Sequence, residues 1–316
     1  MTPEHVLAQP PRILSQPQRE DYFAKGYLLV ERAIQMDWIE RLRAVTAEMV
    51  ERSRQQARSD AVFDLEPDHT PERPRLRRLS SPVVHHPLYW EFLTESPLGD
   101  IAADLVGPDV RFHHQKLNFK WAEGGEEVKW HQDIQFFPHT NYNVLTIGVY
   151  LYDCGPEQGP LGVLPGSHMG PIYNQYNARD QWVGCLSDDD VAGLDLSKAE
   201  YLTGPAGSIT IHHCRTVHGS KPNLSDTGRP LLLQTLSSAD AFPFTHNPLT
   251  TRYYGQCIRG KPARMPHMDP LPCPVPPDWS GGYSSIFALQ QEEAVEASTL
   301  AAELRARRTT EPAPAM

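Results

Sequence analysis

Three residues from two places in the chain could together hold a metal ion. Trp130-His131-Gln132-Asp133 lies in a run with strand character, where residues i and i+2 point to the same side, about 7 Å apart. His131 and Asp133 therefore present an imidazole and a carboxylate to one interior, and His218 follows a later strand-like run. Two histidines and one carboxylate, with the other positions open, are the ligand set of non-haem Fe(II) oxygenases.

An arginine and a serine near His218 support the metal site. The HxD motif is weak by itself, because a chain with 14 histidines can contain it by chance. Arg229 follows His218 at the head of the apolar run 230–233, and Ser220 lies between them. At the mouth of a strand, a guanidinium can clamp the far carboxylate of 2-oxoglutarate with two hydrogen bonds, and Ser220 can donate to the same carboxylate. These residues predict a 2-oxo acid beside the metal.

Several short motifs surround these residues: YFAKGYLLV (22–30), WHQD (130–133), LGVLPGSH (161–168), GSITIHH (207–213), VHGS (217–220) and GRP (228–230). In this order and at these spacings, they resemble the phytanoyl-CoA dioxygenase family over about residues 20–240. The resemblance implies a mainly β fold with flanking helices around a double-stranded β-helix (a jelly-roll, cupin-like core). It also implies Fe(II) at His131, Asp133 and His218, with 2-oxoglutarate held by Arg229 and Ser220 and O2 as the oxidant.

The strand-like run 110–119 carries candidate contacts for the other end of 2-oxoglutarate. His114, Lys116, Asn118 and Lys120 alternate with residues of the other face. If this set faces the barrel interior, Asn118 and Lys116 reach the cosubstrate near the metal. The alternative is that the set forms a solvent-exposed outer face. Thr146, on the next strand, is a further candidate cosubstrate contact.

Two more positions are interpreted through the resemblance. Family members often carry a tryptophan where Gly148 aligns, so its absence here would open room for substrate. The family often has a histidine five residues before the distal ligand, which is His213 here. We expect His213 to support the metal site from behind the ligands, and His168 to stabilise a loop.

The pattern of apolar residues and turn residues predicts one oxygenase domain over residues 18–285. Residues 1–17 are polar and proline-rich and predict a flexible N-terminal arm. Helical periodicity covers 19–56, with a strand at 27–30, and returns at 88–105, so that the helical part extends to about 106. Short strands follow in a jelly-roll core over about 107–240, with an insertion at about 173–201. A proline-rich wrap at 258–282 precedes a C-terminal helix and tail at 286–316.

A basic segment within 57–80 allows two interpretations. Arg73, Arg75, Arg77 and Arg78 lie among prolines and other charges. Such a run is most often a solvated loop, and the other interpretation is a lid that brings cations to an anionic substrate.

Composition excludes several classes of protein. The formal net charge of −10 gives no basic footprint for nucleic acid, and no apolar stretch approaches the ~18 residues of a membrane span. The five cysteines are scattered and form neither a disulfide framework nor a zinc motif. We therefore expect a cytoplasmic protein with a small-molecule substrate, no nucleic acid and no membrane. The sequence does not set the oligomeric state.

The function predicted from these observations is an Fe(II)/2-oxoglutarate-dependent dioxygenase. It would hydroxylate an unactivated C–H bond of a small metabolite and release succinate and CO2. Desaturation, epimerisation and ring formation use the same ligands and stay open, as does the identity of the substrate. Two alternatives keep the barrel: a cupin-type metalloenzyme that needs no 2-oxoglutarate, and a non-catalytic module that binds a metabolite.

Overall fold

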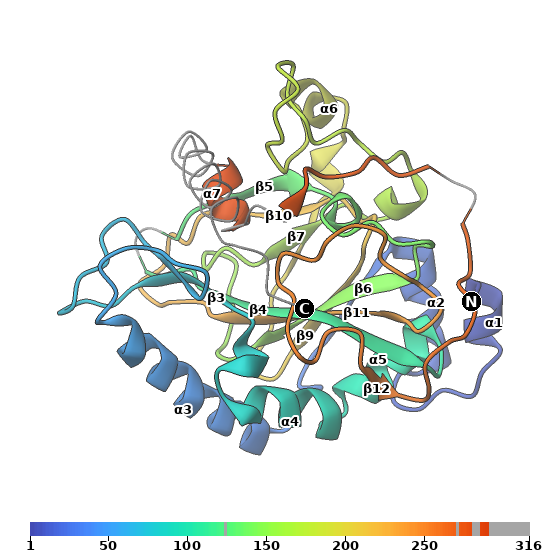
Figure 1. Ribbon diagram of the computed structural model, residues 1–316, viewed down its shortest axis with the longest axis horizontal. Helices are drawn as coiled ribbons and strands as arrows, with labels where there is room; N and C mark the ends of the chain where they lie inside the picture. Colours follow the sequence, from blue (N-terminus) through green and yellow to red (C-terminus); the bar gives the residue numbers. More distant parts are fainter. Residues whose placement is uncertain (123–124, 270–271, 280–284, 291–316) are drawn as a thin grey trace, which may run out of the picture.

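Two facing β-sheets form the centre of the molecule in this computed structural model, which describes residues 1–122, 125–269, 272–279 and 285–290 (Figure 1). The large sheet has the strand order β1-β9-β6-β11-β4-β3-β2, and β12 pairs with β4. The small sheet has the order β5-β10-β7-β8. This architecture, mainly β with flanking helices, confirms the expected jelly-roll core.

The strands are β1 (Tyr27–Val30), β2 (Phe63–Leu65), β3 (Leu76–Ser80), β4 (Val110–Asn118), β5 (Val128–His131), β6 (Val144–Tyr150), β7 (Leu161–Val163), β8 (Glu200–Leu202), β9 (Ile209–His213), β10 (His218–Ser220), β11 (Leu231–Ser238) and β12 (Cys257–Arg259). The helices are α1 (Pro3–Leu7), α2 (Gln16–Lys25), α3 (Met36–Ser53), α4 (Pro87–Glu95), α5 (Leu98–Val106), α6 (Asp188–Ala192) and α7 (Ile286–Gln290). Among the described residues, no helix is long and apolar enough to cross a membrane.

Helices α3, α4 and α5 cover the outer face of the large sheet (Figure 1). In α3 the buried Ile39, Leu42 and Met49 recur at helical spacing and join one apolar core with the sheet. The helix expected over 88–105 is two helices, because Pro97 lacks the N–H that would continue α4. The helical run expected over 19–56 is likewise divided by β1, which begins directly after Gly26 ends α2 in the left-handed conformation.

The N-terminal segment 1–17 differs from the flexible arm expected there. It contains α1, and the side chains of Val6 and Leu14 are buried. The buried carboxylate of Asp104 accepts the backbone N–H groups of Arg12, Ile13 and Leu14 at 2.7–2.8 Å. A single buried carboxylate thus fixes three backbone N–H groups. The polar composition of residues 1–17 does not indicate this distant contact.

The basic segment also differs from its first interpretation, because it is a β-hairpin rather than a solvated loop. Strands β2 and β3 pair, and β3 continues the sheet beside β4. Arg75, Arg77 and Arg78 are buried. Arg77 forms an ion pair of 3.0 Å with the equally buried Asp64, which offsets the cost of burying both charges.

The remaining predictions concern the insertion and the C-terminus. The segment 173–201 contains α6 between strands β7 and β8. The described parts of the proline-rich wrap contain most of β12 and no α-helix. Helix α7 begins at Ile286 as expected, and the predicted continuation to 308 lies outside the described residues.

Candidate metal centre and adjoining cavities

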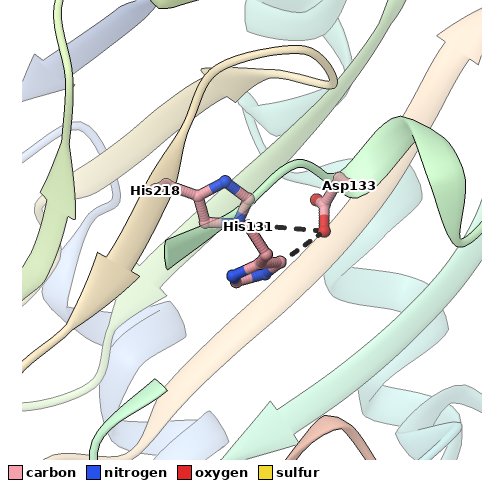
Figure 2. A group of neighbouring side chains, drawn as sticks. All are labelled: His131, Asp133 and His218. Atoms are coloured by element: carbon pink, nitrogen blue, oxygen red, sulfur yellow. Dashed lines mark ion pairs between the residues drawn. The ribbon is translucent and has the colours of Figure 1, made fainter. Parts of the chain in front are cut away.

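The three predicted ligands meet between the two sheets. His131 ends β5 and His218 begins β10, and the two residues face each other in the antiparallel register. Asp133 opens a 3-10 turn directly after β5. The nearest ligand atoms of the three side chains all lie within 4.8 Å of one another, and all three residues are buried. Figure 2 shows both imidazoles turned toward one oxygen of Asp133.

Backbone carbonyls set the orientation of both imidazoles. Nδ1 of His131 lies 2.8 Å from the carbonyl of Lys129, and Nδ1 of His218 lies 2.9 Å from that of Thr216. Each Nδ1 therefore carries the proton and donates it. The two Nε2 atoms, 3.9 and 3.8 Å from Oδ1 of Asp133, are left with lone pairs for a metal.

Burial keeps these groups in the protonation states that a metal needs. Desolvation lowers the pKa of His131 to about 4 and that of His218 well below its usual value, so both imidazoles are neutral at pH 7. Burial alone would raise the pKa of Asp133. The hydrogen bond from His212 and the nearby His218 and Lys116 outweigh it, and the carboxyl titrates well below its usual range.

The second oxygen of Asp133 is fixed by two side chains. Oδ2 accepts a hydrogen bond of 3.0 Å from the hydroxyl of Thr146, and Nε2 of His212 lies 3.2 Å from it. This leaves Oδ1 for the metal. Thr146 was expected at the cosubstrate. It does line the cavity there, but its hydroxyl is bonded to Asp133 and lies 3.0 Å from that of Thr235.

The histidine behind the ligands is His212, not the expected His213. His213 points to the other side of β9, where its ring lies 6.4 Å from that of Tyr22 and 5.3 Å from that of His168. Strand alternation could have identified the correct residue, since Ile209 and Ile211 occupy the apolar face. His168 holds a loop as expected, with Nε2 3.0 Å from the carbonyl of Phe23.

A cavity with about 560 Å³ of empty space, part of it open to solvent, adjoins the ligands. Every residue predicted to contact the cosubstrate lines it: Lys116, Asn118, Thr146, Ser220 and Arg229. The alternating polar residues of β4 therefore face inward rather than toward solvent. Gly148 offers no free space there, because an added Cβ would lie 2.7 Å from the hydroxyl of Thr210.

The buried guanidinium of Arg229 fits a carboxylate guest. One terminal nitrogen donates to the carbonyl of Gly159 at 2.6 Å. Its Nε–H has no hydrogen-bond partner among the residues that the structure describes. An unsatisfied buried donor on a cation is costly, and the carboxylate of a 2-oxo acid would satisfy it.

Lys120 is a cavity residue to which the sequence reasoning gave no role. It lines the same cavity, and its ammonium donates to the carbonyls of Ser220 (3.3 Å) and Lys221. Burial, and secondly the charge of Arg229, lower the pKa of Lys120 to about 6. Lys120 thus braces the loop after β10 from the cavity side.

A second cavity, with about 430 Å³ of empty space that is partly open to solvent, meets the first at Asp133. Both cavities are lined by Lys116, Asp133 and Ile286. The second cavity also has aromatic walls from Phe136, Phe137 and Trp279. A metal held by Asp133 would therefore stand where the two cavities join.

Known proteins share this fold. The structure of EctD from S. alaskensis with bound Fe is similar, with a TM-score of 0.63 at 22% identity over 82% of this chain and 88% of that chain. The non-haem alpha-ketoglutarate-dependent carbocyclase SnoK is similar at a TM-score of 0.59 and 21% identity, over 74% of this chain and 89% of that chain. Both likenesses support the jelly-roll core.

Sequence comparison extends the likeness. The model of the family described as Phytanoyl-CoA dioxygenase (PhyH) matches residues 22–231. A probable alpha-ketoglutarate-dependent hypophosphite dioxygenase from Stutzerimonas stutzeri is 30% identical over 87% of this chain and 96% of its own length. An L-proline trans-4-hydroxylase from Streptomyces griseoviridis is 31% identical over 45% of this chain and 60% of its own.

Proposed function

Because the chain belongs to the phytanoyl-CoA dioxygenase family, we propose that it oxidises a small molecule held in the second cavity, with 2-oxoglutarate in the first. The protein is a non-haem iron, 2-oxoglutarate-dependent dioxygenase, and its relative from Stutzerimonas stutzeri is named as a probable alpha-ketoglutarate-dependent dioxygenase. For this chain, one observation supports the placement of the cosubstrate. Buried Arg229, whose Nε–H is unsatisfied among the described residues, lines the cavity that is also lined by His131, Asp133 and His218.

The residues that line the first cavity have separate roles in this proposal. His131, Asp133 and His218 would hold Fe(II), and Thr146 and His212 orient the carboxylate of Asp133. We assign the far carboxylate of 2-oxoglutarate to Arg229 and Ser220. Its near end then lies toward Asn118, on the metal side of the same cavity, whereas Lys116 lines both cavities.

Bound iron supplies the activation of O2. Overall, the 2-oxo acid loses two electrons and becomes succinate and CO2, the substrate loses two electrons, and O2 takes up all four. One oxygen atom enters succinate and the other enters an X–H bond of the substrate as X–OH. The chain itself positions the reactants and excludes water with the aromatic walls of Phe136, Phe137 and Trp279.

The proposed substrate is small. The relatives described above are named for hypophosphite and proline, both small compounds. We also propose a cytoplasmic enzyme without nucleic-acid or membrane partners, supported by the net charge of −10 and five free cysteines.

Succinate formation tests the function. Protein purified without oxygen is given Fe(II), 2-oxoglutarate and air, and succinate is followed over hours because uncoupled turnover is slow. We expect succinate from the wild type and none from Asp133→Ala. Arg229→Ala should weaken Fe(II)-dependent 2-oxoglutarate binding in calorimetry, whereas Arg252→Ala, which removes an exposed arginine, should not.

The same assay separates the alternatives. A cupin-type enzyme would turn over without 2-oxoglutarate and be indifferent to Arg229→Ala. A binding module would give no succinate under any condition. Either result, together with absent 2-oxoglutarate binding by the wild type, would overturn the proposed function.

A further inference from the structure

The second cavity is basic where it meets the metal site. Apart from the metal ligand Asp133, the ionisable side chains that line it within the described residues are Arg78, His114 and Lys116. No further carboxylate among these lining residues balances them. A cavity lined in this way attracts anions, and its apolar walls strengthen that attraction because they exclude the water that would screen it.

Lys116 is the least satisfied of these groups. Its ammonium forms no hydrogen bond and no ion pair with any residue that the structure describes, although it lines both cavities. Burial lowers the pKa of Lys116 to about 8, while Asp133 opposes the shift. The group is therefore largely charged at pH 7, and partial desolvation of an ammonium that lacks a protein partner is costly. A ligand anion would remove that cost.

Arg78 brings a second cation to the same cavity. It lies on β3, opposite Asn118 of β4 in the antiparallel register, and its Nε donates to the amide oxygen of Asn118 at 3.0 Å. Asn118 lines the first cavity, whereas Arg78 lines the second. This hydrogen bond places the guanidinium directly beside the junction and restricts its rotation.

The other polar residues of the cavity are engaged with the protein. His114 lies with Nδ1 2.7 Å from His113 and Nε2 3.3 Å from the hydroxyl of Thr235. Asn247 donates to the carbonyl of His113 and accepts from the N–H of Leu249. Because burial keeps the pKa of His114 well below its usual value, Lys116 and Arg78 are the cations among the described residues that line this cavity.

We propose that the second cavity takes a small oxyanion as substrate, a phosphorus, sulfur or carboxyl oxyacid whose charge is met by Lys116 and Arg78. This inference rests on the proposed function and adds the class of substrate to it. The oxyanion end faces the cations, and the rest of the molecule lies against Phe136, Phe137 and Trp279. The bond to be oxidised then lies beside Asp133, where the cavities join.

Calorimetry without oxygen tests the inference. Protein loaded with Fe(II) and 2-oxoglutarate is titrated with methylphosphonate, hypophosphite, methanesulfonate and acetate, and with the neutral dimethyl sulfone and acetamide. We expect at least one oxyanion to bind and neither neutral compound to do so. The set of oxyanions that bind then shows whether the site takes phosphorus, sulfur or carboxyl oxyacids.

Variants then locate the binding. Lys116→Met should weaken oxyanion binding by about 10- to 100-fold, the usual effect of losing a charge-assisted hydrogen bond. Arg78→Lys keeps the charge but loses the forked donors of the guanidinium, so it should weaken binding by a smaller factor. Lys129→Met makes the same change at an exposed lysine on β5, in the small sheet, and should leave binding unchanged. Because Arg78 is fully buried, the conservative lysine is used, and thermal melting confirms that each variant folds.

Each outcome has one meaning. No 2-oxoglutarate binding by the wild type would overturn the proposed function itself. If 2-oxoglutarate binds and no oxyanion does, only the present inference fails. Oxyanion binding that is equal in the wild type, Lys116→Met and Arg78→Lys would place the anion on the metal alone and would also overturn it.

Discussion

The two faces of the large sheet are both buried, yet they have opposite chemistry. The outer face, under the helices, is mainly apolar and includes one buried glutamine pair, Gln115 and Gln234, which are hydrogen-bonded to each other at 3.1 Å. Its apolar residues are Phe112, Leu117, Leu145, Ile147, Val149, Ile209, Ile211, Leu232 and Leu236. The inner face of the same strands presents His114, Lys116, Asn118, Thr146, His212 and Thr235. Strand alternation separates the two sets residue by residue.

Because of this difference, neighbouring residues of one strand have different roles: one contributes to stability and the next to the chemistry of the site. The outer face contributes folding free energy through burial of apolar surface. The inner face contains desolvated polar groups that lower stability unless a metal or ligand meets them. Substitutions one residue apart should therefore affect different properties of the protein.

The largest expected effect is on the inner side of the barrel. His218→Ala removes a metal ligand and should reduce succinate formation by on the order of 10³-fold or more, about 4 kcal/mol in activation free energy. The metal-free variant should melt close to the wild type, because no apolar packing is lost. His246→Ala, at an exposed histidine, is the control, and activity within tenfold of wild type in His218→Ala would contradict the assigned ligand set.

The next effect lies on the outer face. Ile209→Ala creates a void in the apolar core, where Ile209 is fully buried, and should lower the free energy of unfolding by about 2–5 kcal/mol. Urea denaturation measures this loss. The rate of succinate formation per folded molecule should stay within about twofold of the wild type. A large loss of specific activity would show that the two faces are coupled.

A pair of neighbouring histidines sharpens the comparison. His212→Gln removes the contact to Oδ2 of Asp133 and should weaken metal binding about 10- to 100-fold, measured by competition with a chelator. His213→Gln makes the same change one residue further, on the other side of β9, and should leave metal affinity unchanged. Equal effects of the two substitutions would be incompatible with the assigned alternation.

The smallest effect is a gain in stability. Lys116→Met should raise the unfolding free energy of the metal-free protein at pH 7 by roughly 1–3 kcal/mol, because it removes a desolvated charge. The folded pKa of about 8 lies below the ordinary value of 10.5, so the unfolded chain binds more protons between these pH values. The penalty is present in full below pH 8 and is lost as the pH rises toward 10.5.

Denaturant unfolding at pH 7 and pH 10 measures this prediction. The difference in stability between Lys116→Met and the wild type should shrink at the higher pH. Lys129→Met, at an exposed position, should show neither the gain nor its pH dependence. A destabilised Lys116→Met at pH 7 would mean that the ammonium has favourable contacts within the protein.

Much of the site was predictable because its key residues lie in short, ordered motifs. The spacing of His131 and Asp133 predicted that both side chains would face one interior, and the structure brings them together with His218 although Asp133 lies in a turn beyond the strand. The error at His213 came from relying on a typical spacing rather than on the strand. The apolar residues Ile209 and Ile211 already indicated that His212 faces inward.

Long-range contacts account for what the sequence did not reveal. Arg77 belongs in the sheet because it pairs with Asp64 on the adjacent strand, and a charged run gives no sign of such a partner. The cavity wall formed by Ile286 comes from a helix far along the chain. The packing of the N-terminus depends in the same way on Asp104, some 90 residues away.

The pairing of His218 opposite His131 has a consequence for how the chain folds. A metal bound by both residues ties together the ends of a loop of roughly 87 residues, and closing such a loop costs about 4 kcal/mol in chain entropy. The ion therefore cannot nucleate folding from a local segment. It finds its ligands only after β5 and β10 have paired, and from then on it acts as a crosslink that resists their separation.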